Sequence, residues 1–257
     1  MAVFEPSREQ VLAFCARDPV ERVFLEDVAR RGFGHFVAIG DADLTALCHL
    51  GANLVPSGKG CGAFADAAAG GHARMIIGEI GAVTDLWQAA RDLLPEARED
   101  RPHQPVYAIE EPPAPGETGL RAATPGDLER LLPACAAAHE LELHVDPIAR
   151  DAENFRWRTA VQIDEGRSWL WLEDDVILFK AEASAWTPQA VQVQQVWVDA
   201  EARGRGYGAR GMRDLVRLLL ETTPTVTLFV RSDNGPAIAT YESIGMRKAL
   251  EYRSVLF

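Results

Sequence analysis

Residues 190–209 read AVQVQQVWVDAEARGRGYGA, and this stretch carries most of the information about the fold. Its first half predicts a buried strand, because apolar and β-branched residues dominate it: Val191, Val193, Val196, Trp197 and Val198. A charged turn follows, then Arg203-Gly204-Arg205-Gly206-Tyr207-Gly208 and the start of a helix. A helix N-terminus offers free N–H groups, and glycines let a ligand approach the backbone closely. The order strand, glycine turn, helix therefore predicts a phosphate-binding loop.

The spacing of the glycines excludes two common phosphate-binding loops. A Walker loop ends in Gly-Lys-Ser/Thr, which this stretch lacks, and a dinucleotide fingerprint needs its third glycine where this chain has Ala209. The pattern that fits is Arg/Gln-x-x-Gly-x-Gly/Ala, with Arg203, Gly206 and Gly208 at its fixed positions.

A second set of motifs follows the glycine loop. A strand is predicted at residues 226–230, then come Asn234, a short helix that carries Tyr241, and Ile244-Gly245-Met246. With both sets of motifs, the chain resembles the GNAT superfamily of acetyl-CoA-dependent N-acetyltransferases over roughly residues 120–257. The family usually has Phe where this chain has Met246, and that change conserves volume.

The resemblance implies an α/β (α+β) fold with two GNAT-like domains, in which mixed, mostly antiparallel sheets are flanked by helices. The expected division is a degenerate GNAT-like domain at residues 1–109, a Pro/Glu-rich linker at 110–118 and a catalytic domain at 119–257. The linker reads EEPPAPGE over most of its length and is too rich in proline for a helix or a central strand. The first half repeats the strand, glycine loop and helix order around residues 57–62, which we interpret as a plain turn rather than a second cofactor site.

A group of bacterial two-domain GNAT proteins is similar to this chain in both halves. The resemblance is carried by ANLVP at residues 52–56 and Gln104-Pro105 in the first half, and by FKAE at 179–182 and VWV at 196–198 in the second. In the second half, the family fold implies that the fourth and fifth strands splay apart to admit the pantetheine arm of the coenzyme.

The phase of the strand before the loop bears on that splay. By period-two counting, Val191 and Val193 share one face, whereas Val196 and Val198 fall on the other, with Gln194-Gln195 at the slip. We interpret the slip as a β-bulge, which would open the strand from its neighbour. The alternative keeps Trp197 in phase with Val191 and Val193 and needs no bulge.

The resemblance also implies which residues bind acetyl-CoA. The expected contacts are the backbone around the bulged strand, the glycine loop and one side chain: Val196, Trp197, Val198, Arg203, Gly204, Arg205, Gly206, Tyr207, Gly208, Ala209 and Asn234. Asn234 could serve instead, or in addition, as the N-cap of the helix that begins near Pro236.

The catalytic residues implied by the resemblance are less complete. Tyr241 stands at the family's position for stabilising the departing thiolate, although an aromatic there could also be a core residue. The bulged strand offers only glutamines where many relatives place a glutamate base. Glu182 is our substitute base, against the alternative of a solvated Lys–Glu face. The segment HELELH at 139–144 could supply a base or bind a cation, or be a polar connector.

Composition limits the partners. The net charge of −12 over 257 residues argues against nucleic-acid binding, and no apolar run reaches membrane-spanning length. Four separated cysteines with no Cys-x-x-Cys pair suggest neither a disulfide framework nor a metal site, and favour a reducing, cytoplasmic location. We expect a monomer or homodimer.

The sequence as a whole predicts direct transfer of an acetyl group from acetyl-CoA to a small-molecule or peptide amine, with no metal. Two rivals stay open. One is a non-catalytic acyl-CoA-binding regulator that has lost its base. The other is a transferase for a longer acyl group, whose size Trp197 and Phe229 would limit.

Overall fold

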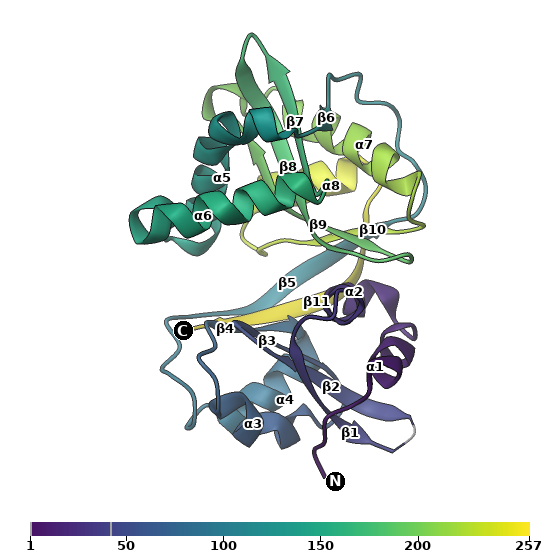
Figure 1. The fold of residues 1–257 in the computed structure, drawn as a ribbon. Coiled ribbons are helices and arrows are strands. Elements are labelled where there is room, and N and C mark those ends of the chain that lie inside the picture. The colour runs from purple at the N-terminus through teal and green to yellow at the C-terminus, as the bar shows by residue number, and fades with distance from the viewer. Residues whose placement is uncertain (1, 42) are drawn as a thin grey trace.

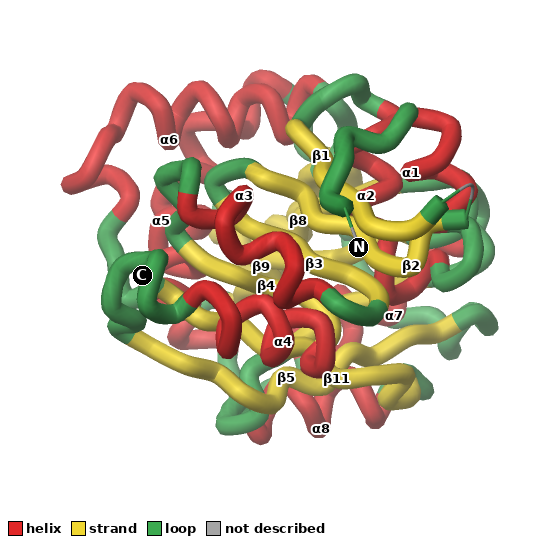
Figure 2. The backbone as a smooth tube through the Cα atoms, turned by 90° about the horizontal axis from the view of Figure 1, so that it is seen from below, coloured by secondary structure: helices red, strands yellow, loops and turns green. Residues whose placement is uncertain are grey.

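A computed structural model describes residues 2–41 and 43–257, whose strands form one sheet of eleven strands. The sheet order is β1-β2-β3-β4-β11-β5-β10-β9-β8-β7-β6, with helices packed on both faces (Figures 1 and 2). The first half of the chain forms one lobe and the second half the other, and β5 and β11 run between them (Figure 1).

The bounds of the elements agree with most of the local sequence signals. The helices of the described chain are α1 Arg8–Cys15, α2 Pro19–Arg30, α3 Ala65–Ala69, α4 Ile80–Ala90, α5 Leu128–Leu143, α6 Pro147–Asp164, α7 Tyr207–Leu220 and α8 Gly235–Ser243. The strands are β1 His35–Gly40, β2 Leu44–Leu50, β3 Asn53–Gly58, β4 Met75–Glu79, β5 Glu99–Ile109, β6 Arg121–Ala122, β7 Ser168–Glu173, β8 Val176–Trp186, β9 Val191–Val198, β10 Val226–Phe229 and β11 Arg247–Leu256.

The two halves repeat one order of elements. Two helices, a three-strand meander, a glycine loop with a helix, a parallel strand, a helix and a last strand occur in each, as α1 to β5 and as α5 to β11. The short strand β6 beside β7 has a counterpart in the single bridge of Phe4 to Ala38 on β1. The first half is therefore a degenerate copy of the second.

Each half gives its last strand to the other half. β11 pairs antiparallel with β4 of the first half, and β5 pairs antiparallel with β10 of the second. The two exchanged strands also pair with each other along most of their length. The division of the chain into two domains at residues 110–118 stays a prediction, because one continuous sheet joins the two halves.

The helices cover separate apolar cores on the two faces of the sheet. In the second half, α7 and α8 bury one face, with Met212, Leu215, Val216 and Leu219 as the predicted stripe of α7. The pair α5 and α6 covers the opposite face. A glycine fixes the distance of α7 from the sheet, because a Cβ on Gly211 would stand 2.5 Å from the Phe179 ring.

Three local features position the site. The segment before the first-half glycine loop is a strand, β3. Helix α5 extends to Leu143, and Arg98 and Arg101 bind its last carbonyls. The predicted linker is held against α7, because Asp214 of α7 accepts hydrogen bonds from the backbone of Gly116 and Thr118.

Candidate active site

The β-bulge expected in the strand before the glycine loop is present in β9. Trp197 pairs with Lys180, and Gln194 pairs with Glu182. The interval between the two pairs is therefore three residues on β9 but only two on β8, which is one extra residue on β9. Gln195 takes the extra position with a φ of 52°, a left-handed conformation that non-glycine residues rarely adopt. The alternative of an unbroken strand is wrong, and Val196 and Val198 rejoin the core on the same face as Val193.

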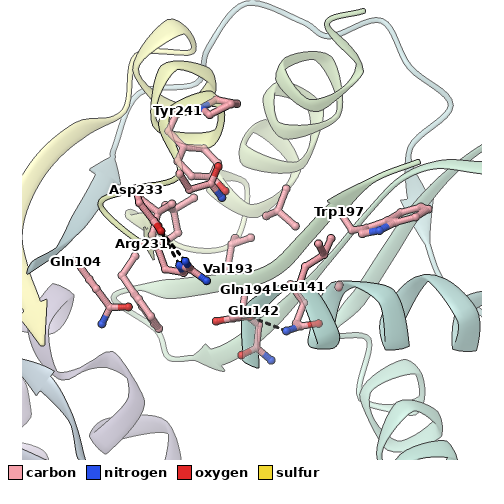
Figure 3. A pocket seen from close by; sticks show the side chains of 17 residues that line it. Gln104, Leu141, Glu142, Val193, Gln194, Trp197, Arg231, Asp233 and Tyr241 are labelled. Carbon is pink, nitrogen blue, oxygen red and sulfur yellow. Dashed lines mark hydrogen bonds and ion pairs between the residues drawn. The ribbon is translucent and has the colours of Figure 1, made fainter. Parts of the chain in front are cut away.

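Beyond its first two residues, β9 separates from β10. The two strands pair in parallel only at Val191 with Val226 and at Gln192 with Thr227. A pocket of about 400 Å³ opens where they part. Its walls come from β9, from the end of β10 and the turn after it, from α5, from α8 and from Gln104 of β5 (Figure 3). The sequence-predicted splay is thus the site of the cavity.

The glycine loop presents unused backbone donors. Gly204 and Gly206 have φ values of 75° and 81°, and a Cβ built on either meets no atom within 4 Å, so both face open space. Within residues 2–41 and 43–257, the N–H groups of 204–209 donate no hydrogen bond, and the first α7 bond runs from Arg210 N to Gly206 O. This arrangement is that of an anion site at a helix start.

Packing holds that helix start in place. The Tyr207 ring lies against Trp171, with centroids 5.1 Å apart, so this residue offers its backbone rather than its side chain to the open side. The Nε of Arg203 donates to the Val198 carbonyl at 3.2 Å. That carbonyl is therefore already bonded, and Val196 is the better candidate for strand-like pairing with an extended ligand.

The pocket brings together some of the predicted site residues and not others. Val196, Trp197, Asn234 and Tyr241 line it, whereas Val198 and the glycine loop lie outside its lining. Asn234 also caps α8, with its Oδ1 accepting from the N–H of Ala237 at 3.2 Å, so the expected N-cap is confirmed, and the contact of Asn234 with the coenzyme stays a prediction.

Tyr241 reaches the pocket from α8 (Figure 3). Its side chain is buried, packed near Tyr107, and in the described chain its hydroxyl has no hydrogen-bond partner. Burial raises the pKa of Tyr241, and the nearby Glu142 raises it further. Tyr241 therefore stays a protonated donor at neutral pH, with a hydroxyl free to bond a ligand.

Two carboxylates line the pocket, and one of them, Asp233, is paired with Arg231. The other, Glu142, lies in the last turn of α5, half-buried, and its Oε2 accepts a hydrogen bond from Nε2 of Gln195 at 2.8 Å (Figure 3). Burial raises its pKa, although the Arg101 charge and the Gln195 bond both lower it. A carboxylate with a raised pKa in a pocket is suited to accept a proton.

Glu182, the base expected from the sequence, is placed elsewhere. Its Oε1 accepts from Lys180 Nζ at 2.6 Å, and the Cys135 thiol lies 3.3 Å from the same oxygen. Lys180 is fully buried, so the Lys–Glu pair is neither solvated nor part of the pocket lining. We withdraw Glu182 as the base and keep Glu142, which sequence reasoning named only as part of the segment 139–144.

Glu142 and Tyr241 enter the cavity from opposite walls, one from α5 and one from α8 (Figure 3). A carboxylate and a protonated phenol thus flank the pocket, and β9, which forms one of its walls, leads on to the glycine loop at the start of α7. Such a pocket can hold a long extended anionic ligand and deprotonate a second one beside it.

Comparison with known families agrees with this geometry. Residues 131–246 match the family model described as "Acetyltransferase (GNAT) family", and residues 33–131 match a domain of unknown function, DUF4081. A mycothiol acetyltransferase of Nocardioides sp. (strain ATCC BAA-499 / JS614) is 30% identical over 253 residues, covering 84% of this chain and 80% of that protein. The chain belongs to the GNAT acetyltransferase family.

Other relatives are shorter matches. A mycothiol acetyltransferase of Mycobacterium sp. (strain MCS) is 35% identical over 154 residues, which are 52% of this chain and 48% of the relative, so the chain spans about half the length of that protein.

Among solved structures, a GCN5-related N-acetyltransferase from Sphaerobacter thermophilus superposes with a TM-score of 0.64 at 17% identity, covering 98% of this chain and 94% of that one. A tandem GNAT protein from the clavulanic acid biosynthesis pathway gives 0.58 at 14% identity, covering 99% and 98%. At these identities the structures show the fold alone.

Among the described residues, none of the helices combines the length and the apolar character of a membrane span. The same residues also hold no group of three or more His, Cys, Asp or Glu side chains arranged to hold a metal ion.

Proposed function

We propose that this protein transfers an acetyl group from acetyl-CoA directly to a primary amine in the cleft between β9 and β10. The observation that carries the proposal is the junction of two features. The strands part after Gln192, and the unbonded amides of residues 204–209 stand at the start of the next helix. One feature fits the pantetheine arm and the other the diphosphate.

The coenzyme-binding roles follow from the free backbone groups. The N–H groups of Gly204, Gly206 and Gly208 and their neighbours would bind the diphosphate, with the positive end of α7 and the charges of Arg203 and Arg205 in support. The exposed edge of β9 at Val196 would pair with the amides of the arm in the manner of an added strand. Trp197 and Asn234 would line the same slot.

Glu142 takes the proton of the acceptor in this scheme. An amine with a pKa near 10.4 costs about 4.6 kcal/mol to deprotonate at pH 7, so a base beside it is useful. Glu142 takes the first proton, which converts the ammonium to the neutral amine. The neutral amine then attacks the thioester carbonyl, a C–N bond forms and the C–S bond breaks. The second proton leaves the nitrogen as the amide forms and ends on the departing sulfur, so that CoA leaves as the free thiol.

Tyr241 faces the sulfur side of the reaction. Its hydroxyl would donate a hydrogen bond to the departing thiolate as charge develops there. Full transfer from a phenol of pKa about 10 to a thiolate of about 8.5 is uphill by about 2 kcal/mol in water, and burial of Tyr241 increases that difference. A strong hydrogen bond, rather than complete proton transfer, is therefore its role.

The acceptor that fits best is a polar, cationic amine. Gln104, Gln194 and Gln195 supply amide donors and acceptors around Glu142, and the net charge of −12 attracts a cation. The relatives are named for mycothiol, which makes a mycothiol-related amine one acceptor worth testing.

We place the reaction in the cytoplasm, which the four buried free cysteines support.

The test is release of free thiol from acetyl-CoA in the presence of a panel of amines: a mycothiol-related amine, a polyamine, an amino sugar, and peptides with a free N-terminus or lysine. Acetyl-CoA binding is measured by calorimetry on the same sample. Amine-dependent thiol release supports the proposal. Tight binding without turnover by any amine would favour a non-catalytic acyl-CoA binder, and faster release from propionyl- or succinyl-CoA would favour the longer-acyl transferase.

A further inference from the structure

We propose that Arg101, from the degenerate first half, is a positioning residue that fixes Glu142 in the active site of the second half. The proposal rests on the function proposed above, since it concerns the base of that reaction. It assigns the first half a part in catalysis that needs no coenzyme of its own.

The contact is direct and well buried. One guanidinium nitrogen of Arg101, Nη2, donates to the backbone carbonyl of Glu142 at 2.8 Å. The same guanidinium pairs with both carboxylate oxygens of Glu99, at 2.7 and 2.8 Å. The Arg101 side chain is only 10% exposed. A planar guanidinium that is bonded to Glu99 on one side and to the Glu142 carbonyl on the other has few rotamers left. The position of β5 therefore fixes the position of the last turn of α5.

The end of α5 needs such a partner. The last carbonyls of a helix have no donor within the helix and carry partial negative charge. Arg101 bonds the carbonyl of Glu142, and Arg98 lies 3.5 Å from that of Leu143. His144 then ends the helix in a left-handed conformation, with its N–H bonded to Glu140 O at 2.8 Å. Two arginines of the first half thus complete the turn that carries the base.

Strand exchange explains why the first half reaches this place. β5 lies between β11 and β10, and β10 forms one wall of the pocket. From the same strand, Gln104 lines the pocket itself. Arg101 therefore stands on an element that is inserted into the catalytic half, and its contact does not depend on a loose interface between two lobes.

Arg101 also acts on the charge of Glu142. The charged and polar groups that face this carboxyl are Arg101 from β5, Gln195 from β9, Lys180 and Glu182 from β8, Arg231 after β10 and Tyr241 from α8. Arg101 is the largest of the influences that lower the Glu142 pKa, against the burial that raises it. Loss of this cation should raise the pKa of the base and displace its peptide.

The experiment compares Arg101→Met with Arg253→Met in the full chain. Arg253 makes a similar bidentate pair with Asp100, the neighbour of Arg101 on β5, but it contacts Thr84 rather than α5. The control thus removes a similar bidentate ion pair next to Arg101, one that joins β11 to β5, whereas the Arg101–Glu99 pair lies within β5. Amide hydrogen exchange of residues 140–144 is one readout, and the pH profile of kcat with a responsive amine is the other.

In Arg101→Met, we expect exchange in the last turn of α5 to speed up by about tenfold or more. We also expect the acidic limb of kcat to move up by about one pH unit. Arg253→Met should match the wild type both in exchange at residues 140–144 and in the pH of the acidic limb. Arg101→Lys should move the pH of that limb part of the way back to the wild-type value. Unchanged exchange at 140–144, or equal changes in both Met variants, would overturn the proposal. Absence of turnover in the wild type would count against the function alone, because the exchange readout needs no activity.

Discussion

The side-chain amide of Gln195 donates a 2.8 Å hydrogen bond to the carboxylate of Glu142. Gln195 is the residue that the β-bulge forces into a left-handed conformation, so the feature that opens the sheet also aims a donor at the pocket carboxylate. Backbone strain of this kind costs about 1–3 kcal/mol and persists where the surroundings hold it in place. In this protein the strained residue links the bulge of β9 to the proposed base, Glu142.

Replacing Glu142 with Gln should lower kcat by about 100-fold or more, because a positioned base contributes about 10² to 10⁴ in rate. Acetyl-CoA affinity should stay within a factor of two. Glu140→Gln is the matched control, since Glu140 is exposed on the same helix and does not line the pocket. Equal turnover in the two variants, measured as thiol release, would remove Glu142 from the mechanism.

The rate should depend on pH through Glu142. Burial raises the pKa of this carboxyl, and the base works in its deprotonated form, so kcat should rise with pH through that raised pKa and level off above it. The limb should therefore lie above the ordinary glutamate value of about 4.3. Gln195→Ala removes a hydrogen bond to the carboxylate and should move the limb up by about one unit. A limb that does not move in this variant would contradict the assignment.

Tyr241→Phe should reduce kcat by about tenfold to a thousandfold and leave acetyl-CoA binding nearly unchanged, because the hydroxyl is needed only as the thiolate forms. Tyr107→Phe serves as the control. Its ring packs near that of Tyr241, but its hydroxyl bonds Glu242 and it does not line the pocket. If kcat is the same in both variants, Tyr241 is a core residue and no more.

Gly211→Ala should destabilise the fold. The new Cβ would stand 2.5 Å from the Phe179 ring, so α7 must shift, at a cost of about 1–3 kcal/mol, which exceeds the roughly 1 kcal/mol that alanine gains over glycine in a helix. Gly235→Ala, where the added Cβ meets no atom within 4 Å, should change little. Midpoints of urea unfolding compare the two, and equal midpoints would show that α7 can move freely.

The parts of this site that could be predicted from the sequence are those set by neighbours along the chain. The glycine loop and the bulge at Gln195 show in local spacing, as does the stripe of α7. Glu142 could not be assigned in this way, because the side chains that bind the last carbonyls of α5, Arg98 and Arg101, lie about forty residues earlier in the chain.

Glu182 shows the opposite limit of sequence reasoning. Its alternation with Lys180 along β8 left two readings open, a base or a solvated polar face, but α5 covers that face and leaves the pair buried with Cys135. The exchange of β5 and β11 was equally hidden, since strand pairing between halves depends on packing rather than on local pattern. The signal that did exist was the acidic segment 139–144 beside the expected cleft.

Amide hydrogen exchange with and without acetyl-CoA tests most directly whether the coenzyme lies along β9 with its diphosphate at the start of α7. The account predicts slower exchange on binding at residues 204–209 and at the β9 edge around Val196, with little change at the equivalent glycine segment 58–62 of the first half. Binding that leaves 204–209 unprotected, or that protects 58–62 instead, would contradict it.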